Sequence, residues 1–177
     1  MELETDRLIL RPHRAEDLSD IQRYAVRPAF YRYLAIPAQT PETVAAFLEG
    51  QLAAQGSDDG NHSFVLEHKD LRCVIGSVRL GVRDAVHRHG DLGYALDSDH
   101  QGHGYMTEAV RAVLRMGFEQ LALHRIWATA DIRNKRSWHL LGRCGMKREG
   151  RLREHRLVRG RWRDSYLYSI LETDERP

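Results

Sequence analysis

Two glycines in a short polar loop are the residues of this chain whose spacing most clearly suggests chemistry. Gly102 and Gly104 lie between an apolar run, residues 92–96, and a helix pattern that begins near Thr107. The unpaired N–H groups of a first helical turn and the helix dipole attract anions, and glycine lets the backbone approach a ligand closely. The loop therefore predicts a phosphate or pyrophosphate site, with a ligand-free strand-to-helix turn as the alternative. It is neither a P-loop nor a complete dinucleotide fingerprint, because no Gly-Lys-Ser/Thr follows and the third glycine is missing.

A second polar segment comes where a later apolar run gives way to a short helix pattern. Asn134-Lys135-Arg136-Ser137 follows the expected strand 125–130. The alternative to a functional role is local, because asparagine is a common helix N-cap and a serine three residues later is ordinary in a first turn. The position after a strand, together with the upstream glycine loop, favours a functional role for Asn134 and Ser137.

These two segments and the helix between them resemble the acyl-CoA site of the GCN5-related N-acetyltransferases (GNAT). Three further segments resemble the branch that acetylates the N-termini of ribosomal proteins: Glu4-Thr5-Asp6-Arg7-Leu8-Ile9-Leu10-Arg11-Pro12, Gly93-Tyr94-Ala95-Leu96-Asp97 and Gly160-Arg161-Trp162-Arg163-Asp164. The resemblance covers nearly the whole chain, with its landmarks in family order. It implies an α/β fold in one domain, residues 1–177, with a mixed, mostly antiparallel central sheet flanked by helices.

The resemblance also implies acetyl-CoA as cosubstrate and indicates which residues bind it. The pyrophosphate would lie on backbone N–H groups of the glycine loop, and Asn134 would hydrogen-bond the pantetheine arm. The expected cofactor-binding residues are Leu96, Asp97, Gln101, Gly102, His103, Gly104, Tyr105, Met106, Thr107, Asn134 and Ser137. Thr107 has a second interpretation as the cap of the following helix. Asp99 is a departure, since the family commonly has glutamine or arginine at this place.

The implied reaction is direct acyl transfer, in which an amine attacks the thioester and CoA thiolate leaves. Many relatives place a tyrosine seven residues after the asparagine to protonate the thiolate, but this chain has Leu141 there. Ser137 is therefore the expected acid. The amine needs a proton acceptor, for which Asp91 is the first candidate and Glu154 the second, with a surface carboxylate as the alternative for each. A backbone N–H of strand 91–97 is expected to stabilise the oxyanion.

The expected activity is acetyl transfer to a primary amine, with a protein N-terminus, such as that of a ribosomal protein, as the first substrate class. Small amines, including amino acids, polyamines and aminoglycosides, are the close alternative, and a non-catalytic acyl-CoA-binding module is the rival from another class. Residues 151–163 contain six arginines. Such a run is usually a solvated face, and the alternative is a collar that attracts an acidic partner. Direct nucleic-acid binding is not expected, because the net charge is only +2 and aromatic-rich RNA-recognition signals are missing.

Composition limits the remaining possibilities. The 177 residues suit one domain with a substantial core. No apolar run has the length of a membrane span, and the acidic N-terminus does not look like a signal peptide, so a cytoplasmic protein without a membrane partner is expected. Cys73 and Cys144 are expected to be buried free thiols, and no metal-ligand spacing organises the histidines. A homodimer is left open.

Periodicity places the elements around these segments. Alternating patterns predict strands at residues 8–11, 62–68, 73–80, 91–97 and 125–130, and a final hairpin of residues 152–158 and 162–171. Helical patterns cover residues 15–25, 41–52, 107–121 and 134–144.

Overall fold

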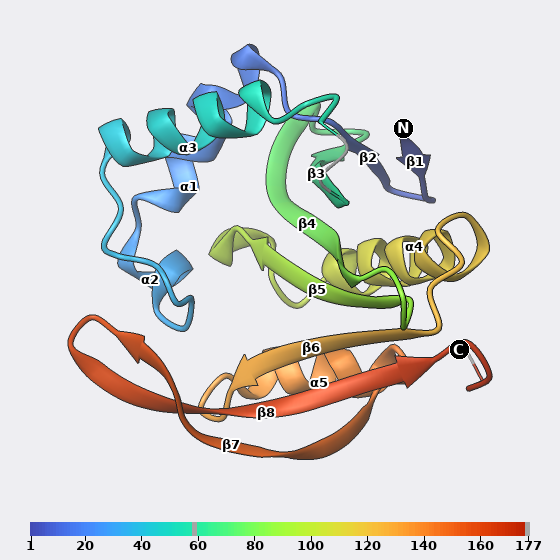
Figure 1. The fold of residues 1–177 in the computed structure, drawn as a ribbon. Coiled ribbons are helices and arrows are strands. Elements are labelled where there is room, and N and C mark those ends of the chain that lie inside the picture. Colours follow the sequence, from blue (N-terminus) through green and yellow to red (C-terminus); the bar gives the residue numbers. More distant parts are fainter. Residues whose placement is uncertain (58–59, 176–177) are drawn as a thin grey trace.

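The computed structural model describes residues 1–57 and 60–175, whose arrangement is shown in Figure 1. The strands are β1 (Leu3–Glu4), β2 (Leu8–Arg11), β3 (Asn61–His68), β4 (Cys73–Asp84), β5 (His89–Leu96), β6 (Arg125–Asp131), β7 (Lys147–Val158) and β8 (Arg161–Leu171). Within the described residues they form one eight-stranded sheet in the order β1-β2-β3-β4-β5-β6-β8-β7. Neighbouring strands are antiparallel except β5 and β6, which are parallel. The predicted mixed, mostly antiparallel sheet is confirmed.

Helices cover both faces of this sheet. They are α1 (Leu18–Ala25), α2 (Pro28–Tyr31), α3 (Pro41–Ala53), α4 (Tyr105–Glu119) and α5 (Lys135–Arg143), with 3₁₀ turns η1 (Ala15–Asp17) and η2 (Ser98–His100). Thr40 caps α3, because its hydroxyl accepts a hydrogen bond from the Thr43 N–H at 3.3 Å. In the described part of the chain, no helix is long and apolar enough to cross a membrane.

Two apolar clusters hold the layers together. On one face, Val110 and Val113 of α4 pack with Leu8 of β2 and Leu80 of β4, and the cluster continues to α5. On the other face, α1 and α3 bury residues such as Ile21, Val44 and Leu48 against Val65 and Val74. The helix pair α1–α3 and the pair α4–α5 therefore lie on opposite faces of one sheet (Figure 1).

The structure departs from the sequence prediction at several element boundaries. The predicted helix 15–25 begins as a 3₁₀ turn, and the short elements β1 and α2 were not predicted. β7 begins at Lys147 rather than at residue 152. Most of its side chains are exposed, because it is an edge strand of the sheet, and such a strand shows little apolar alternation. Both cysteines are free: Cys144 is buried and Cys73 half-buried.

Candidate active site

The parallel strands β5 and β6 separate along their length. They pair only between residues 89–91 and residues 125–127, although β5 continues to Leu96 and β6 to Asp131. Figure 1 shows the two strands diverging toward their C-terminal ends. In open α/β sheets, ligands bind outside the carboxyl ends of the strands, where neighbouring strands separate. This opening between β5 and β6 is therefore the expected location of a ligand site.

A cleft of about 1610 Å³ lies beside this opening. We call it the α4–α5 cleft, because both helices contribute to its lining. It brings together the two segments singled out in the sequence, and the predicted residues that line it are Leu96, Gln101, Gly102, Gly104, Tyr105, Met106, Thr107, Asn134 and Ser137. His103 lies within the same loop, between the lining residues Gly102 and Gly104.

The start of α4 offers a row of backbone donors. Gly104 is the N-cap residue with φ of 84° and makes no side-chain cap, so the alternative interpretation of Thr107 as the cap was wrong. Within the described residues, the N–H groups of residues 102–107 have no hydrogen-bond acceptor. Unpaired N–H groups at the positive end of a helix dipole suit an anionic ligand. The local geometry therefore fits the pyrophosphate of acetyl-CoA.

Two arginines of the family-like segments, for which no role was predicted, flank this row of donors. Arg136 of α5 donates to Gln101 Oε1 at 2.7 Å. Arg7 donates to the His103 carbonyl at 3.0 Å and also binds Glu108 of α4. Burial raises the pKa of Glu108, but hydrogen bonds from Thr5 and Arg7 outweigh it and lower the pKa overall. Glu108 is therefore ionised and neutralises Arg7, which leaves Arg136 as the loop's more available positive charge.

Asn134 and Ser137 lie at the start of α5, where they face the cleft. Asn134 Oδ1 accepts the Ser137 N–H at 3.3 Å, so the local N-cap interpretation is correct for that oxygen. The Ser137 hydroxyl lies 2.8 Å from the Tyr94 hydroxyl of β5. Burial raises the pKa of Tyr94, which keeps its phenol protonated. Tyr94 belongs to the family-like segment 93–97, but no role was predicted for it.

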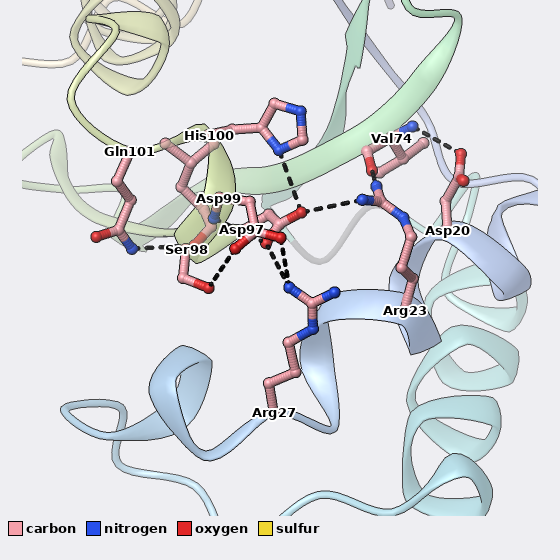
Figure 2. Close-up of polar contacts among 10 residues, drawn as sticks. Asp20, Arg23, Arg27, Val74, Asp97, Ser98, Asp99, His100 and Gln101 are labelled. Carbon is pink, nitrogen blue, oxygen red and sulfur yellow. Dashed lines mark hydrogen bonds and ion pairs between the residues drawn. The ribbon is translucent and has the colours of Figure 1, made fainter.

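The Asp97 carboxylate is fully buried and takes part in a network rather than lining the cleft (Figure 2). It accepts hydrogen bonds from Arg23 of α1 at 3.2 Å and from the Asp99 N–H at 3.2 Å, and it contacts His100. Its side chain therefore shapes the loop that leads to Gly102 and does not line the cleft, and a cofactor-binding role for Asp97 stays a prediction.

Asp99, which departs from the family pattern, has its own partner in this network. Its carboxylate binds Arg27 at 2.6 Å, and Arg27 is the N-cap residue of α2 (Figure 2). The hydrogen bond from Arg27 lowers the pKa of Asp99. The loop before α4 is thus tied to α2, a connection that no sequence motif indicated.

A second cavity of about 1150 Å³ lies on the opposite face of the sheet, under α1, α2 and α3. We call it the α1–α3 groove. Four residues line both this groove and the α4–α5 cleft: Phe30, Leu34, Tyr94 and Ala95. The two cavities therefore meet beside β5, where Tyr94 contacts Ser137.

The two carboxylates predicted as proton acceptors lie in different places. Asp91 belongs to β5 and forms a two-point ion pair with Arg79, with distances of 2.7 and 3.0 Å, and a third hydrogen bond from Arg83. Burial raises the pKa of Asp91, but the two arginines outweigh this effect and lower it overall. Glu154 is exposed on β7, has a positive φ of 48° and lines neither cavity. The structure does not bring either carboxylate together with Ser137.

Part of the arginine-rich segment has an internal role. Arg159 donates to the carbonyls of Arg32 and Ile36 at 2.8 Å each, and Arg163 donates to the Arg32 carbonyl at 2.9 Å. These bonds join the β7–β8 hairpin to the segment that carries Leu34. Arg151 pairs with Asp164. Within the described residues, no group of three or more His, Cys, Asp or Glu side chains could hold a metal ion.

Comparisons with known proteins agree with this geometry. The family model described as acetyltransferase (GNAT) domain matches residues 7–147. An uncharacterized N-acetyltransferase of Bacillus subtilis is 28% identical over 98% of this chain and 99% of its own length. A spermidine N(1)-acetyltransferase of Vibrio cholerae is 29% identical over 66% of each chain. The solved ribosomal-protein-S5-alanine acetyltransferase of Vibrio fischeri is 26% identical, with a TM-score of 0.83 and 100% of both chains covered.

The family match spans both segments that line the cleft, the glycine loop and residues 134–137. The solved ribosomal-protein acetyltransferase agrees with the branch indicated by the sequence. The chain therefore belongs to the GNAT family of acetyltransferases, which take acetyl-CoA as their cosubstrate.

Proposed function

We propose that this N-acetyltransferase works where its two cavities meet, with acetyl-CoA held in the α4–α5 cleft and a primary amine arriving through the α1–α3 groove. The observation that carries the proposal is the lining shared by both cavities, which includes Tyr94 and Ala95 of β5. Acetyl-CoA and the amine can meet from opposite faces of the sheet only where the two cavities are connected. A tight approach of the two reactants supplies much of the rate enhancement in group transfer.

The residues of the cleft suit the parts of acetyl-CoA. The N–H groups of residues 102–107 would hold the pyrophosphate, with Arg136 beside them. Asn134 uses its side-chain oxygen for the α5 cap, which leaves the amide nitrogen as the donor for the pantetheine arm. When bound, the cosubstrate supplies an acetyl group activated as a thioester.

Ser137 is the proposed proton donor to the leaving sulfur. In the transfer an N–C bond forms and the C–S bond breaks, so the amine loses a proton and the sulfur gains one. Ser137 Oγ provides that proton and regains one from solvent, and the Tyr94 hydroxyl at 2.8 Å orients the serine hydroxyl. A positioned acid of this kind contributes about 10²- to 10⁴-fold to a rate.

The proton lost by the amine is proposed to pass to water in the groove. Asp91 is occupied by Arg79 and Arg83, and its lowered pKa makes it a weak base. Glu154 lines neither cavity. Among the described residues, no carboxylate lines the groove. The amine would therefore lose its proton before or during attack, without a carboxylate partner.

The test is acetyl transfer to a panel of amines, followed as release of the CoA thiol and as acetylated product by mass spectrometry. Amine-dependent release with one acetyl group on the product supports the proposal. Tight binding of acetyl-CoA without transfer to any amine would instead favour a non-catalytic acyl-CoA-binding module.

A further inference from the structure

The floor of the α1–α3 groove is built from small side chains. Ser77 of β4 pairs in register with Ala95 of β5, and in the adjacent row Arg79 of β4 lies between Ser63 of β3 and Gly93 of β5. All five line the groove, and all but Arg79 are small. Because side chains this small cannot fill the space below three helices, the sheet leaves room for a ligand where close packing would be normal.

The upper wall of the groove is mainly apolar. Phe30 and Leu34 lie at the junction with the cleft, and Phe47 of α3 lies farther along. Phe47 is 47% exposed and makes an edge contact with His13. His13 is buried, and its Nε2 has no hydrogen-bond partner within the described residues. Burial lowers the pKa of His13 to about 4, so this ring adds a polar atom but no positive charge at neutral pH.

The formal charges in the groove are of one sign. Arg79 and Arg83 line it, and none of its described lining residues is an aspartate or glutamate. A Cβ at Gly93 would lie 3.2 Å from Arg79 Nε, so this guanidinium lies across the glycine. Asp91, which is 8% exposed, holds both guanidiniums from the side and neutralises one of the two charges. One net positive charge is therefore fixed on the floor of the groove.

The spacing of this charge from the junction suits a specific type of molecule. Gly93 and Ala95 are two residues apart on β5, so their Cα atoms are separated by about 6.6 Å along the strand. In an α-amino acid the amine nitrogen and a carboxylate oxygen are about 3 Å apart, from standard bond lengths. A charge-assisted hydrogen bond adds about 2.8 Å. An amine placed beside Ala95 would therefore bring its own carboxylate to Arg79.

We infer that the acceptor is an apolar α-amino acid or a close analogue, with its amine at the junction, its side chain against Phe30 and Leu34, and its carboxylate on Arg79 and Arg83. This inference rests on the proposed function, because it assumes that the amine enters through this groove. A polyamine would bring further positive charges to two guanidiniums without meeting a described carboxylate. A peptide N-terminus would lack the free carboxylate at this distance.

The experiment compares leucine with two analogues that lack only its free carboxylate, and with a peptide and a polyamine. The wild-type enzyme is assayed with acetyl-CoA and leucine, leucinamide, isopentylamine, an alanyl peptide or spermidine. Leucine should have the highest kcat/KM, leucinamide and isopentylamine values lower by about tenfold or more, and spermidine the lowest, because a site built to bind a carboxylate discriminates against its absence. A kcat/KM for spermidine, leucinamide or the peptide equal to or above that for leucine would overturn the inference while leaving the proposed function intact.

Variants of the two groove arginines test how the enzyme recognises leucine, and a control variant tests for effects on folding. Arg79→Gln and Arg83→Gln should each raise the KM for leucine about tenfold and reduce its advantage over leucinamide, with unchanged acetyl-CoA affinity by calorimetry. The matched control is Arg88→Gln, whose guanidinium binds the Ala122 carbonyl and Glu172 instead, and it should behave as wild type. Unchanged leucine KM in both groove variants contradicts the inference. Acetyl-CoA binding without transfer to any amine contradicts the proposed function as well.

Discussion

The Tyr94 hydroxyl and Ser137 Oγ lie 2.8 Å apart and join β5 to the first turn of α5. The same phenol also donates to the Ser137 carbonyl, at 3.2 Å. Tyr94 lines both cavities, whereas Ser137 lines the α4–α5 cleft alone. The pair thus connects the residue expected to protonate the leaving sulfur with the groove proposed for the acceptor.

Replacement of Ser137 by alanine should reduce kcat by about 10²-fold or more, because the leaving sulfur loses its proton donor. The affinity for acetyl-CoA, measured by calorimetry, should change little. Ser169→Ala is a suitable control, since the Ser169 hydroxyl donates to Glu149 on β7. Tyr94→Phe should lower kcat by a smaller factor, because it removes only the hydroxyl that orients Ser137. An unchanged kcat in Ser137→Ala, with chemistry rate-limiting, would reduce Ser137 to a residue of the α5 cap.

Gly104→Val should abolish most of the acetyl-CoA binding. Gly104 has a φ of 84°, and its N–H belongs to the row of donors at the start of α4. A branched side chain is strained in this conformation and occupies the approach to the donors. Calorimetric titration with CoA provides the measurement, and Gly50→Val, at a mid-α3 glycine with open space around it, controls for the branched side chain itself. Equal CoA affinity in Gly104→Val and the wild type would show that the loop does not hold the pyrophosphate.

Asp91→Asn should leave the alkaline-rising limb of the pH–rate profile in place. Arg79 and Arg83 lower the pKa of Asp91 below its ordinary value despite burial, so its carboxylate is already ionised throughout the neutral and alkaline range. A group that does not titrate there cannot produce the limb. The acceptor KM should rise, because the variant releases two guanidiniums from their fixed positions. Loss of the limb in Asp91→Asn would identify Asp91 as the base instead.

His13 should make the folded protein less stable as the pH falls from about 6.5 to about 4. Burial lowers the pKa of His13 to about 4 from an ordinary value of 6.5, so in this interval the unfolded chain binds a proton that the folded chain does not. Stability therefore rises with pH across the interval, by up to roughly 3 kcal/mol for this one group. Urea unfolding of the wild type and His13→Gln at several pH values tests this. A pH dependence that is the same in both proteins would rule out the His13 contribution.

Arg27→Gln should raise the KM for acetyl-CoA and the KM for the amine together, each by a small factor. Arg27 binds Asp99 in the loop before α4 and also begins α2, which carries Phe30 at the junction. Because the ion pair is exposed, the expected rise in each KM is about two- to fivefold. Arg136→Gln provides the contrast, since Arg136 hydrogen-bonds Gln101 on the loop side and should affect the KM for acetyl-CoA alone. If Arg27→Gln changes the KM for only one of the two substrates, the loop before α4 and α2 act independently.

The cleft proposed to hold the cofactor could be predicted from local sequence. An anion-binding helix start depends on glycines and on the N–H groups of neighbouring residues, all of which lie within the same few positions of the chain. The same holds for the Asn134 cap and the serine three residues later. Both segments line one cleft, and Gly104 at the start of α4 has a positive φ of 84°.

Contacts between distant residues were decided by the tertiary structure alone. The sequence indicates that Asp91 begins a strand, but only the register of β4 and β5 places Arg79 and Arg83 on its carboxylate and lowers its pKa. Likewise, Tyr94 and Ser137 lie 43 positions apart in the chain and come into contact beside the place where β5 separates from β6. The physical reason is that helix starts and caps depend on near neighbours in the chain, whereas ion pairs, hydroxyl pairs and groove linings depend on sheet register and on the face that each residue occupies.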